Sequence, residues 1–275
     1  NKIFFDELGV REPDYFMDAA GNTSIETIAN ILKKSDDLLN EIKPDAFLVY
    51  GDTNSCLSVI SAKRRKVPVF HFEAGNRCFD LRVPEEINRK IVDHTSDINF
   101  VLSEHARRYL EAEGIQKNRI FKTGSHMFEV LNEKSNKING SDILKTLGLS
   151  KKAYFVVSIH REENVDDGKT LSKVFKSLER IFKVYGLPII VSTHPRTQKS
   201  IEANDITIIP EIKLCKPFGF FDYIKLQKEA FCVISDSGTI SEESSLLEFP
   251  AVMIREMHER PEGTDVGAVP LGSLE

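Results

Sequence analysis

The sequence predicts an α/β protein built around two doubly wound parallel sheets. Short apolar runs alternate with amphipathic helical stretches along most of the chain. The alternation pauses over residues 126–150, which include a stretch rich in Lys and Ser at 134–137, and then restarts. Strand–helix alternation of this kind is typical of parallel sheets whose strands are joined by helices. We therefore expect an N-terminal domain over residues 1–150 and a C-terminal domain over residues 151–275.

The first half contains four expected strands, over residues 46–50, 67–72, 97–102 and 119–122. A helix is expected behind Thr23, which forms a capping-box pattern with Glu26, and it stops at Pro44. Further helices are expected from Cys56 to about Arg65, over 84–94 and over 103–110. The helix over 84–94 begins with a proline, which favours the first turn.

The second half repeats this organisation with short apolar strands expected over residues 154–159, 187–192, 206–209, 231–234 and 251–254. Apolar residues between 171 and 182 recur at helical spacing, and Gly186 is expected to end that helix. Another helix is expected to begin after Thr239 and to end near Glu248. A cleft between two such domains is a usual place for a small ligand.

Composition and charge exclude several classes of protein. The chain has 275 residues and a net charge of −5, which gives no indication of a nucleic-acid surface. Its four cysteines form no C-x-x-C pair and are expected to be reduced thiols of a cytoplasmic protein. No transmembrane stretch or signal peptide is visible, so no membrane association is expected. Both ends read as cut, because the chain begins with Asn1 and its last residues have no helical ending.

Three carboxylates are expected at one edge of the first sheet. Asp52 and Glu73 each follow an apolar strand, and Glu85 opens the next helix. Ligands of open α/β sheets bind at the carboxyl ends of the strands, where crowding can separate carboxyl pKa values for acid/base work. The alternatives are structural: Asp52 could cap a helix, and Glu85 could form a surface ion pair with Arg89. Glu73, between apolar neighbours, needs a partner.

The second half offers groups suited to an anion. The small-residue turn Ser237, Gly238 and Thr239 opens a helix, whose N-terminus suits a phosphate, although Asp236 or Ser237 could simply cap it. Glu243 lies on the next turn, where it could accept ribose hydroxyls. His160 leaves the first strand of this half and could stabilise a departing phosphate or move a proton. Its alternative role is a turn histidine bonded to backbone.

Other patterns are absent from the sequence. It contains no G-x-G-x-x-G, Y-x-x-x-K or P-loop motif, which disfavours a nicotinamide-dependent enzyme. It has no D-x-D motif and no His/Cys cluster with metal spacing. No cofactor and no metal site are therefore expected.

Six motifs in order give the chain a family resemblance. They are G-D-T-N-S (51–55), H-F-E-A-G-N-R (71–77), V-P-E-E-I-N-R (83–89), H-R-E-E-N (160–164), S-D-S-G-T-I-S-E-E (235–243) and H-E-R-P-E-G (258–263). Together they resemble the non-hydrolysing UDP-N-acetylglucosamine 2-epimerases. The resemblance implies two Rossmann-like domains in the glycosyltransferase-B arrangement, with the active site in the interdomain cleft. The family's opening strand with its G-T-R-P-E loop and its C-terminal helical region have no counterpart here.

The resemblance also implies roles for individual residues. Asp52, Glu73 and Glu85 match the acid/base carboxylates, and His160 matches the histidine beside the diphosphate. The expected UDP-binding residues are Tyr223 near the uracil, Ser237, Gly238 and Thr239 at the phosphates, Glu243 at the ribose, and Arg260. Two positions depart from the common pattern: Glu162 stands where the family usually has Arg, and Thr239 where it usually has Gly.

The implied reaction is inversion at C2 of a UDP-2-acetamido sugar by elimination and re-addition of UDP. The motif variants resemble the capsule and O-antigen branch, which converts UDP-2-acetamido-2,6-dideoxy-L-talose to UDP-N-acetyl-L-fucosamine. Alternatives are epimerisation of UDP-N-acetylglucosamine to UDP-N-acetylmannosamine, a hydrolysing 2-epimerase, a UDP-glycosyltransferase on the same fold, and a binding-only fragment. The expected partners are the UDP-sugar and a second copy of the chain.

Overall fold

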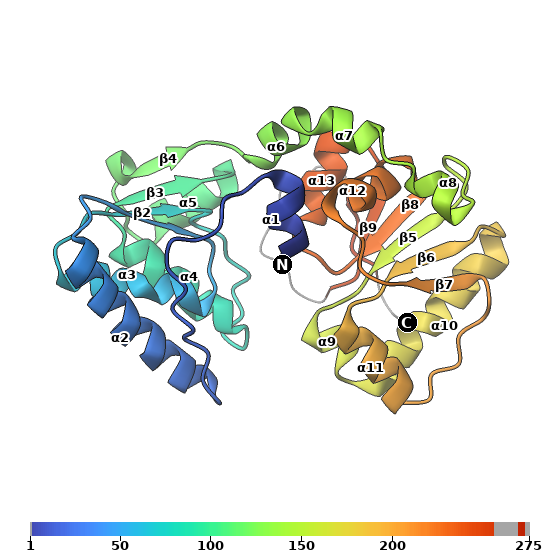
Figure 1. Cartoon of the computed structure of the whole chain (residues 1–275), viewed down its shortest axis with the longest axis horizontal. Coiled ribbons are helices and arrows are strands. Elements are labelled where there is room, and N and C mark those ends of the chain that lie inside the picture. Colours follow the sequence, from blue (N-terminus) through green and yellow to red (C-terminus); the bar gives the residue numbers. More distant parts are fainter. Residues whose placement is uncertain (1, 256–268, 273–275) are drawn as a thin grey trace. The chain divides into compact units, whose positions relative to one another are not determined.

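The computed structural model of the chain describes residues 2–255 and 269–272, and the chain divides into two compact units (Figure 1). One unit contains residues 13–126, and the other contains residues 127–255 with residues 2–12 and 269–272. Each unit has its own parallel sheet, which confirms the predicted α/β class. Among the helices described, none is long and apolar enough to cross a membrane.

The unit of residues 13–126 contains a sheet of strands in the order β1-β2-β3-β4. The strands are β1 (Phe47–Tyr50), β2 (Val69–Phe72), β3 (Ile98–Val101) and β4 (Ile120–Lys122). The helices between and around them are α2 (Ser24–Ile42), η1 (Asn54–Ser58), α3 (Val59–Arg64), α4 (Pro84–Thr95), α5 (Glu104–Ala112) and η2 (Lys117–Arg119). Tyr50 pairs with Phe72, so the carboxyl ends of β1 and β2 lie level with each other.

Buried and partly exposed side chains alternate along these strands, so the sheet has one buried face. Val49, Val69 and Val101 are buried on that face against residues of the surrounding helices. Two polar residues, His71 and Asn99, occupy inward positions of β2 and β3 and are also buried. Inward polar residues need hydrogen-bond partners, so their presence indicates a polar network under the sheet.

The second unit contains a sheet in the order β7-β6-β5-β8-β9. Its strands are β5 (Phe155–Ser158), β6 (Ile189–Ser192), β7 (Ile212–Cys215), β8 (Cys232–Ser235) and β9 (Ala251–Met253). From the first strand, β5, the chain builds β6 and β7 on one side and then β8 and β9 on the other. A crevice at the carboxyl ends of the strands, where the strand order reverses, is the usual ligand site of such a sheet.

Helices cover both faces of this second sheet (Figure 1). α10 (Gly168–Tyr185) packs its apolar residues against Phe155, Val157 and Ile234, with α9 (Glu162–Val165) and α11 (Pro195–Ala203) beside it. α12 (Phe220–Glu229) and α13 (Ile240–Leu247) bury residues against Val156 and Val233 on the other face. This is the doubly wound arrangement that the sequence predicts for the second half.

Four further helices belong to the same unit. They are α1 (Lys2–Leu8), α6 (Met127–Glu133), α7 (Ser135–Asn139) and α8 (Ile143–Leu147). α7 and α8 contact α12, α6 contacts α13, and Leu131, Ile138 and Ile224 form a small apolar cluster. The helices that precede the expected boundary near residue 150 thus pack on helices of the second unit.

One expected strand is wrong. Residues 206–209 form no strand, and the sheet instead takes up Ile212–Cys215 as β7. Ile206, Ile208 and Ile209 pack against the apolar cluster under the sheet as irregular chain. Pro210 has no backbone N–H to give to a strand pair, and Ile212 N donates to Ile209 O in a turn. The sheet pairing begins only beyond this turn, with Ile189 opposite Ile212.

Candidate active site

The three carboxylates expected from the sequence lie at the carboxyl edge of the first sheet. Asp52 comes two residues after β1, Glu73 follows β2 directly, and Glu85 is in the first turn of α4. All three side chains are half-buried. A half-buried carboxylate keeps access to a ligand while its neighbours control its geometry.

Asp52 is held by the N-terminal part of α4. Its carboxylate accepts a hydrogen bond from Arg89 Nε at 2.8 Å, and its backbone carbonyl accepts one from Asn88 Nδ2 at 2.9 Å. The helix-capping alternative is wrong for Asp52, because Thr53 is the N-cap residue of η1. Asp52 is therefore oriented by an ion pair rather than by a cap.

Glu73 has the left-handed backbone conformation, with φ of 68°. A non-glycine residue in this region is strained by roughly 1–3 kcal/mol, and such strain clusters at functional sites. The partner expected for Glu73 is present, because Asn76 Nδ2 donates to its Oε1 at 3.4 Å. Gly75 follows with φ of 79°, and a Cβ there would lie 2.6 Å from the carbonyl oxygen of Ala106. Only glycine allows this loop to approach α5.

Glu86, next to Glu85, has no exposed surface and organises the loop before α4. Its carboxylate accepts hydrogen bonds from Cys78 N at 3.0 Å, Phe79 N at 3.2 Å and Arg89 Nη1 at 3.1 Å. Burial alone would raise the pKa of Glu86, but these hydrogen bonds outweigh it and lower the pKa. Arg89 is buried and pairs with Asp52 and Glu86, so the alternative of a surface ion pair between Glu85 and Arg89 is wrong.

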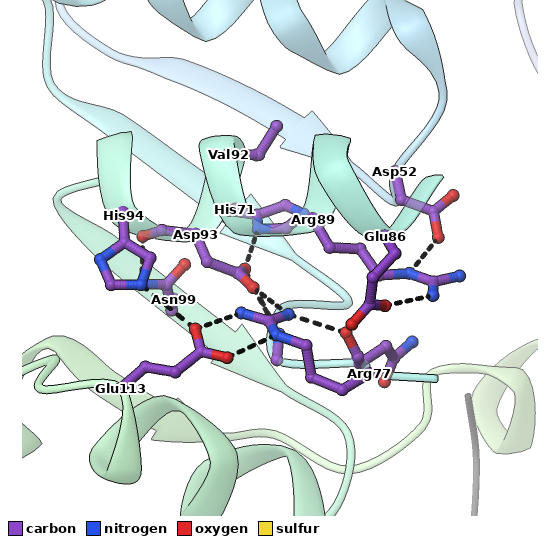
Figure 2. A network of polar contacts seen from close by, with 12 residues as sticks. Asp52, His71, Arg77, Glu86, Arg89, Val92, Asp93, His94, Asn99 and Glu113 are labelled. Atoms are coloured by element: carbon purple, nitrogen blue, oxygen red, sulfur yellow. Dashed lines mark hydrogen bonds and ion pairs between the residues drawn. The ribbon is translucent and has the colours of Figure 1, made fainter. Parts of the chain in front are cut away.

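A second set of buried charges braces the loop that carries Glu73 (Figure 2). Asp93 on α4 accepts from His71 Nδ1 at 2.8 Å, from Arg77 Nη1 at 2.7 Å and from Gly75 N. The other ring nitrogen of His71 lies 2.8 Å from Gly51 O, just before Asp52. Arg77 also pairs with Glu113, the residue directly after α5, through two hydrogen bonds of 2.7 Å. The network ties the ends of β1 and β2 to α4 and α5.

The second unit contains a pocket of about 350 Å³ at the carboxyl ends of β5 and β6. Three of the expected site residues, His160, Tyr223 and Glu243, line it. Its other lining residues are Ser158, Ser192, His194, Pro217, Phe218, Phe220 and Ile224. Aromatic and apolar walls with a few polar groups are typical of a site for a small organic ligand.

Glu243 and Tyr223 line the pocket from α13 and α12. Glu243 is buried on α13, and its Oε2 accepts a hydrogen bond of 2.7 Å from Gln227 on α12. Tyr223 is half-buried on α12, and burial raises the pKa of its hydroxyl, which therefore stays protonated at neutral pH. Neutral Tyr223 offers the pocket a flat ring and one polar atom.

The turn Ser237–Thr239 opens α13 without a side-chain cap. Thr239 is the N-cap residue but makes no capping hydrogen bond, and its hydroxyl lies 2.9 Å from that of Ser237. Asp236 bonds the backbone of His160 and Arg161 instead. The capping alternative for Asp236 or Ser237 is therefore wrong, and hydroxyl groups and a helix N-terminus remain for an anion.

Arg260, expected at the diphosphate, lies outside the described residues. Within the described chain, no group of three or more His, Cys, Asp or Glu side chains is placed to hold a metal ion. The sequence interpretation missed the roles of His71, Arg77, Glu86 and Asp93. A polar residue at the inward position of a strand, such as His71 between Phe70 and Phe72, was the available signal.

Comparison with known proteins identifies relatives over almost the whole chain. Residues 1–274 match the family described as UDP-N-acetylglucosamine 2-epimerase. A protein of that name from Methanocaldococcus jannaschii is 34% identical, over 98% of this chain and 75% of the relative. A UDP-2,3-diacetamido-2,3-dideoxy-D-glucuronate 2-epimerase from Pseudomonas aeruginosa is 33% identical, with the same two coverages.

Solved structures of proteins with the same family name are also similar to this chain. The UDP-N-acetylglucosamine 2-epimerase of Rickettsia bellii is 52% identical with a TM-score of 0.86, over 96% of this chain and 70% of that one. The M. jannaschii enzyme in complex with UDP-GlcNAc and UDP is 33% identical with a TM-score of 0.92, over 100% and 78%. The two parallel α/β units are those that the glycosyltransferase-B fold combines. The chain belongs to the UDP-N-acetylglucosamine 2-epimerase family, and its members are isomerases.

Proposed function

We propose that the chain inverts C2 of a UDP-2-acetamido sugar by eliminating UDP across C1–C2 and adding it back. The observation that carries this proposal is the cluster of Asp52, Glu73 and Glu85 at one sheet edge in a chain of this family. The C2 proton has no adjacent carbonyl, so simple deprotonation is implausible. Elimination needs a base on one face of the sugar and an acid on the other, and carboxylates in different surroundings meet that need.

The proposed roles combine the family resemblance with the positions of the residues that the structure describes. Asp52, fixed by Arg89, and Glu73, on its strained turn, serve one face of the sugar, and Glu85 serves the other. In the second unit, Tyr223 packs on the uracil and Glu243 accepts the ribose hydroxyls. His160, the turn of Ser237, Gly238 and Thr239, and Arg260 stabilise the departing diphosphate. No cofactor enters this scheme.

Two sugars are candidates for the substrate. The motif variants favour UDP-2-acetamido-2,6-dideoxy-L-talose, with UDP-N-acetyl-L-fucosamine as the product for capsule or O-antigen synthesis. The names of several relatives, including the R. bellii protein at 52% identity, favour UDP-N-acetylglucosamine. Both share the UDP-2-acetamido group on which the proposed chemistry depends.

The experiment is incubation of the protein with each nucleotide sugar in D₂O, followed by NMR of the sugar C2 position. We expect one of them to give its C2 epimer, still attached to UDP, with deuterium at C2. Transfer of the sugar without deuterium at C2 would indicate a glycosyltransferase. Release of free sugar and UDP would indicate a hydrolysing epimerase. UDP binding by calorimetry without any turnover would indicate a binding-only chain, and each of these three outcomes contradicts the proposal.

A further inference from the structure

Asp236 is a fully buried carboxylate at the end of β8, where the strand order of the second sheet reverses. It reaches across to the end of the adjacent β5 and accepts hydrogen bonds from His160 N at 3.0 Å and Arg161 N at 2.9 Å. Asn164 Nδ2 donates to it at 3.1 Å. Burial opposes the charge, but the hydrogen bond from His160 and these other donors keep the pKa of Asp236 below its usual value.

The same carboxylate holds the ring of His160. Nδ1 of His160 lies 3.0 Å from Asp236 Oδ1. An ionised carboxylate can only accept, so a hydrogen bond between these two atoms requires the hydrogen to be on Nδ1. Nε2 is then the ring nitrogen left to serve a ligand. The His160 side chain is 44% exposed and lines the pocket, so one part of the ring is anchored and another is accessible.

We infer that Asp236 is a positioning residue, which fixes the tautomer and orientation of His160 so that Nε2 faces the ligand. This inference rests on the proposed function, in which His160 acts at the leaving diphosphate. A neutral ring held in this way accepts a proton at Nε2, and a protonated ring donates from Nε2 to a phosphate oxygen. The carboxylate of a Ser-His-Asp triad constrains its histidine by the same physics.

Replacing Asp236 by Asn separates a positioning role from a purely structural one. Asn at this position keeps the volume and one acceptor oxygen for the backbone N–H groups. Its amide nitrogen, however, can donate to Nδ1 and so moves the ring hydrogen to Nε2. Asp236→Asn therefore tests the tautomer with a small change in packing. Asn164→Ala is the matched control, because it removes a donor to Asp236 but leaves the contact with Nδ1.

The test measures ¹⁵N chemical shifts of His160 and turnover in the same proteins. We expect Nδ1–H in the wild type and in Asn164→Ala, and Nε2–H in Asp236→Asn. Turnover in Asp236→Asn should fall about 100-fold, and the double variant Asp236→Asn/His160→Asn should fall no further than His160→Asn alone. If the losses of turnover in the two single variants multiply in the double variant, the inference is overturned. So would an unprotonated Nδ1 in the wild type, a result that requires no variant to fold.

The NMR readout separates this inference from the proposed function. If the protein shows no epimerisation but Asp236→Asn still moves the hydrogen of His160, the proposed reaction fails and the positioning of His160 by Asp236 stands. If epimerisation occurs but the His160 tautomer is the same in the wild type and in Asp236→Asn, the positioning role of Asp236 is refuted and the proposed reaction stands.

Discussion

Glu85 and Glu86 are adjacent in sequence, but the structure assigns them opposite consequences on substitution. Glu86 is fully buried and accepts hydrogen bonds from Cys78 N, Phe79 N and Arg89 Nη1. Glu85 is half-buried at the edge where the expected site lies. We expect Glu86→Gln to loosen α4 and the preceding loop, and Glu85→Gln to stop chemistry while leaving this region intact.

The magnitude for Glu86→Gln follows from its contacts. Oε1 accepts from Phe79 N, while Oε2 accepts from Cys78 N and Arg89 Nη1. Whichever oxygen the amide replaces, an N–H group then faces another donor. A lost charge-assisted hydrogen bond costs about 1.5–3 kcal/mol, and removing one partner of a buried pair costs more. Arg89 retains Asp52, so we expect a loss of about 3 kcal/mol in the local free energy of opening.

The assay is hydrogen exchange of the α4 backbone amides in the folded protein, which reports local opening without requiring both units to unfold together. A loss of about 3 kcal/mol corresponds to exchange roughly 100-fold faster. Glu85→Gln should exchange like the wild type but incorporate no deuterium at the sugar C2. Unchanged α4 protection in Glu86→Gln would refute the account of the network. Undiminished C2 exchange in Glu85→Gln would refute the role given to Glu85.

Three further predictions follow from the same structure. Glu73 has φ of 68°, a backbone conformation that glycine adopts without strain and alanine does not. Glu73→Gly should therefore be about 1 kcal/mol more stable than Glu73→Ala in chemical unfolding. Equal stability of the two variants would show that the backbone at this position is not strained. The pKa values of Asp236 and Glu86 in the folded protein lie below their usual values. The ionised groups therefore stabilise the folded protein fully above the unfolded carboxyl pKa of about 4. This stabilisation is lost as the pH falls through the lower folded-state pKa values. The melting temperature of the wild type should therefore drop more than that of Glu86→Gln between about pH 6 and pH 3, the range in which carboxyl groups titrate. Equal drops in melting temperature would exclude a contribution of Glu86 ionisation to stability. Tyr223→Ala should weaken UDP binding by about tenfold, because it removes a stacking surface worth about 1–3 kcal/mol. Tyr185→Ala, at the end of α10 and outside the pocket, is the control and should leave UDP affinity unchanged. Calorimetry with UDP measures both affinities.

The strands and their polar ends were predictable because their signals are local. The apolar run before Gly51 became β1, the run before Glu73 became β2, and Pro84 began α4 as expected. The expected strand over 206–209 failed because an apolar run can pack irregularly against a core, and Pro210 and the turn before β7 decided the pairing. Local periodicity cannot distinguish these two uses of the same residues.

The network around the carboxylates was not predictable in the same way. Arg77 and Asp93 are 16 residues apart in sequence, and Arg77 and Glu113 are 36 apart. Their pairing depends on how α4 and α5 pack beside β2, which no local pattern encodes. Arg89 illustrates the difficulty, because its helical spacing favours Glu85 while burial leads it to Glu86 and Asp52.

The proposed reaction requires that the C1–O bond to UDP breaks and re-forms during inversion at C2. Positional isotope exchange tests it most directly, with ¹⁸O placed in the oxygen that joins C1 to the β-phosphate. We expect this ¹⁸O to move into the non-bridging β-phosphate positions of the recovered nucleotide sugar while C2 acquires solvent deuterium. Inversion at C2 with all the ¹⁸O still in the bridging position would contradict it.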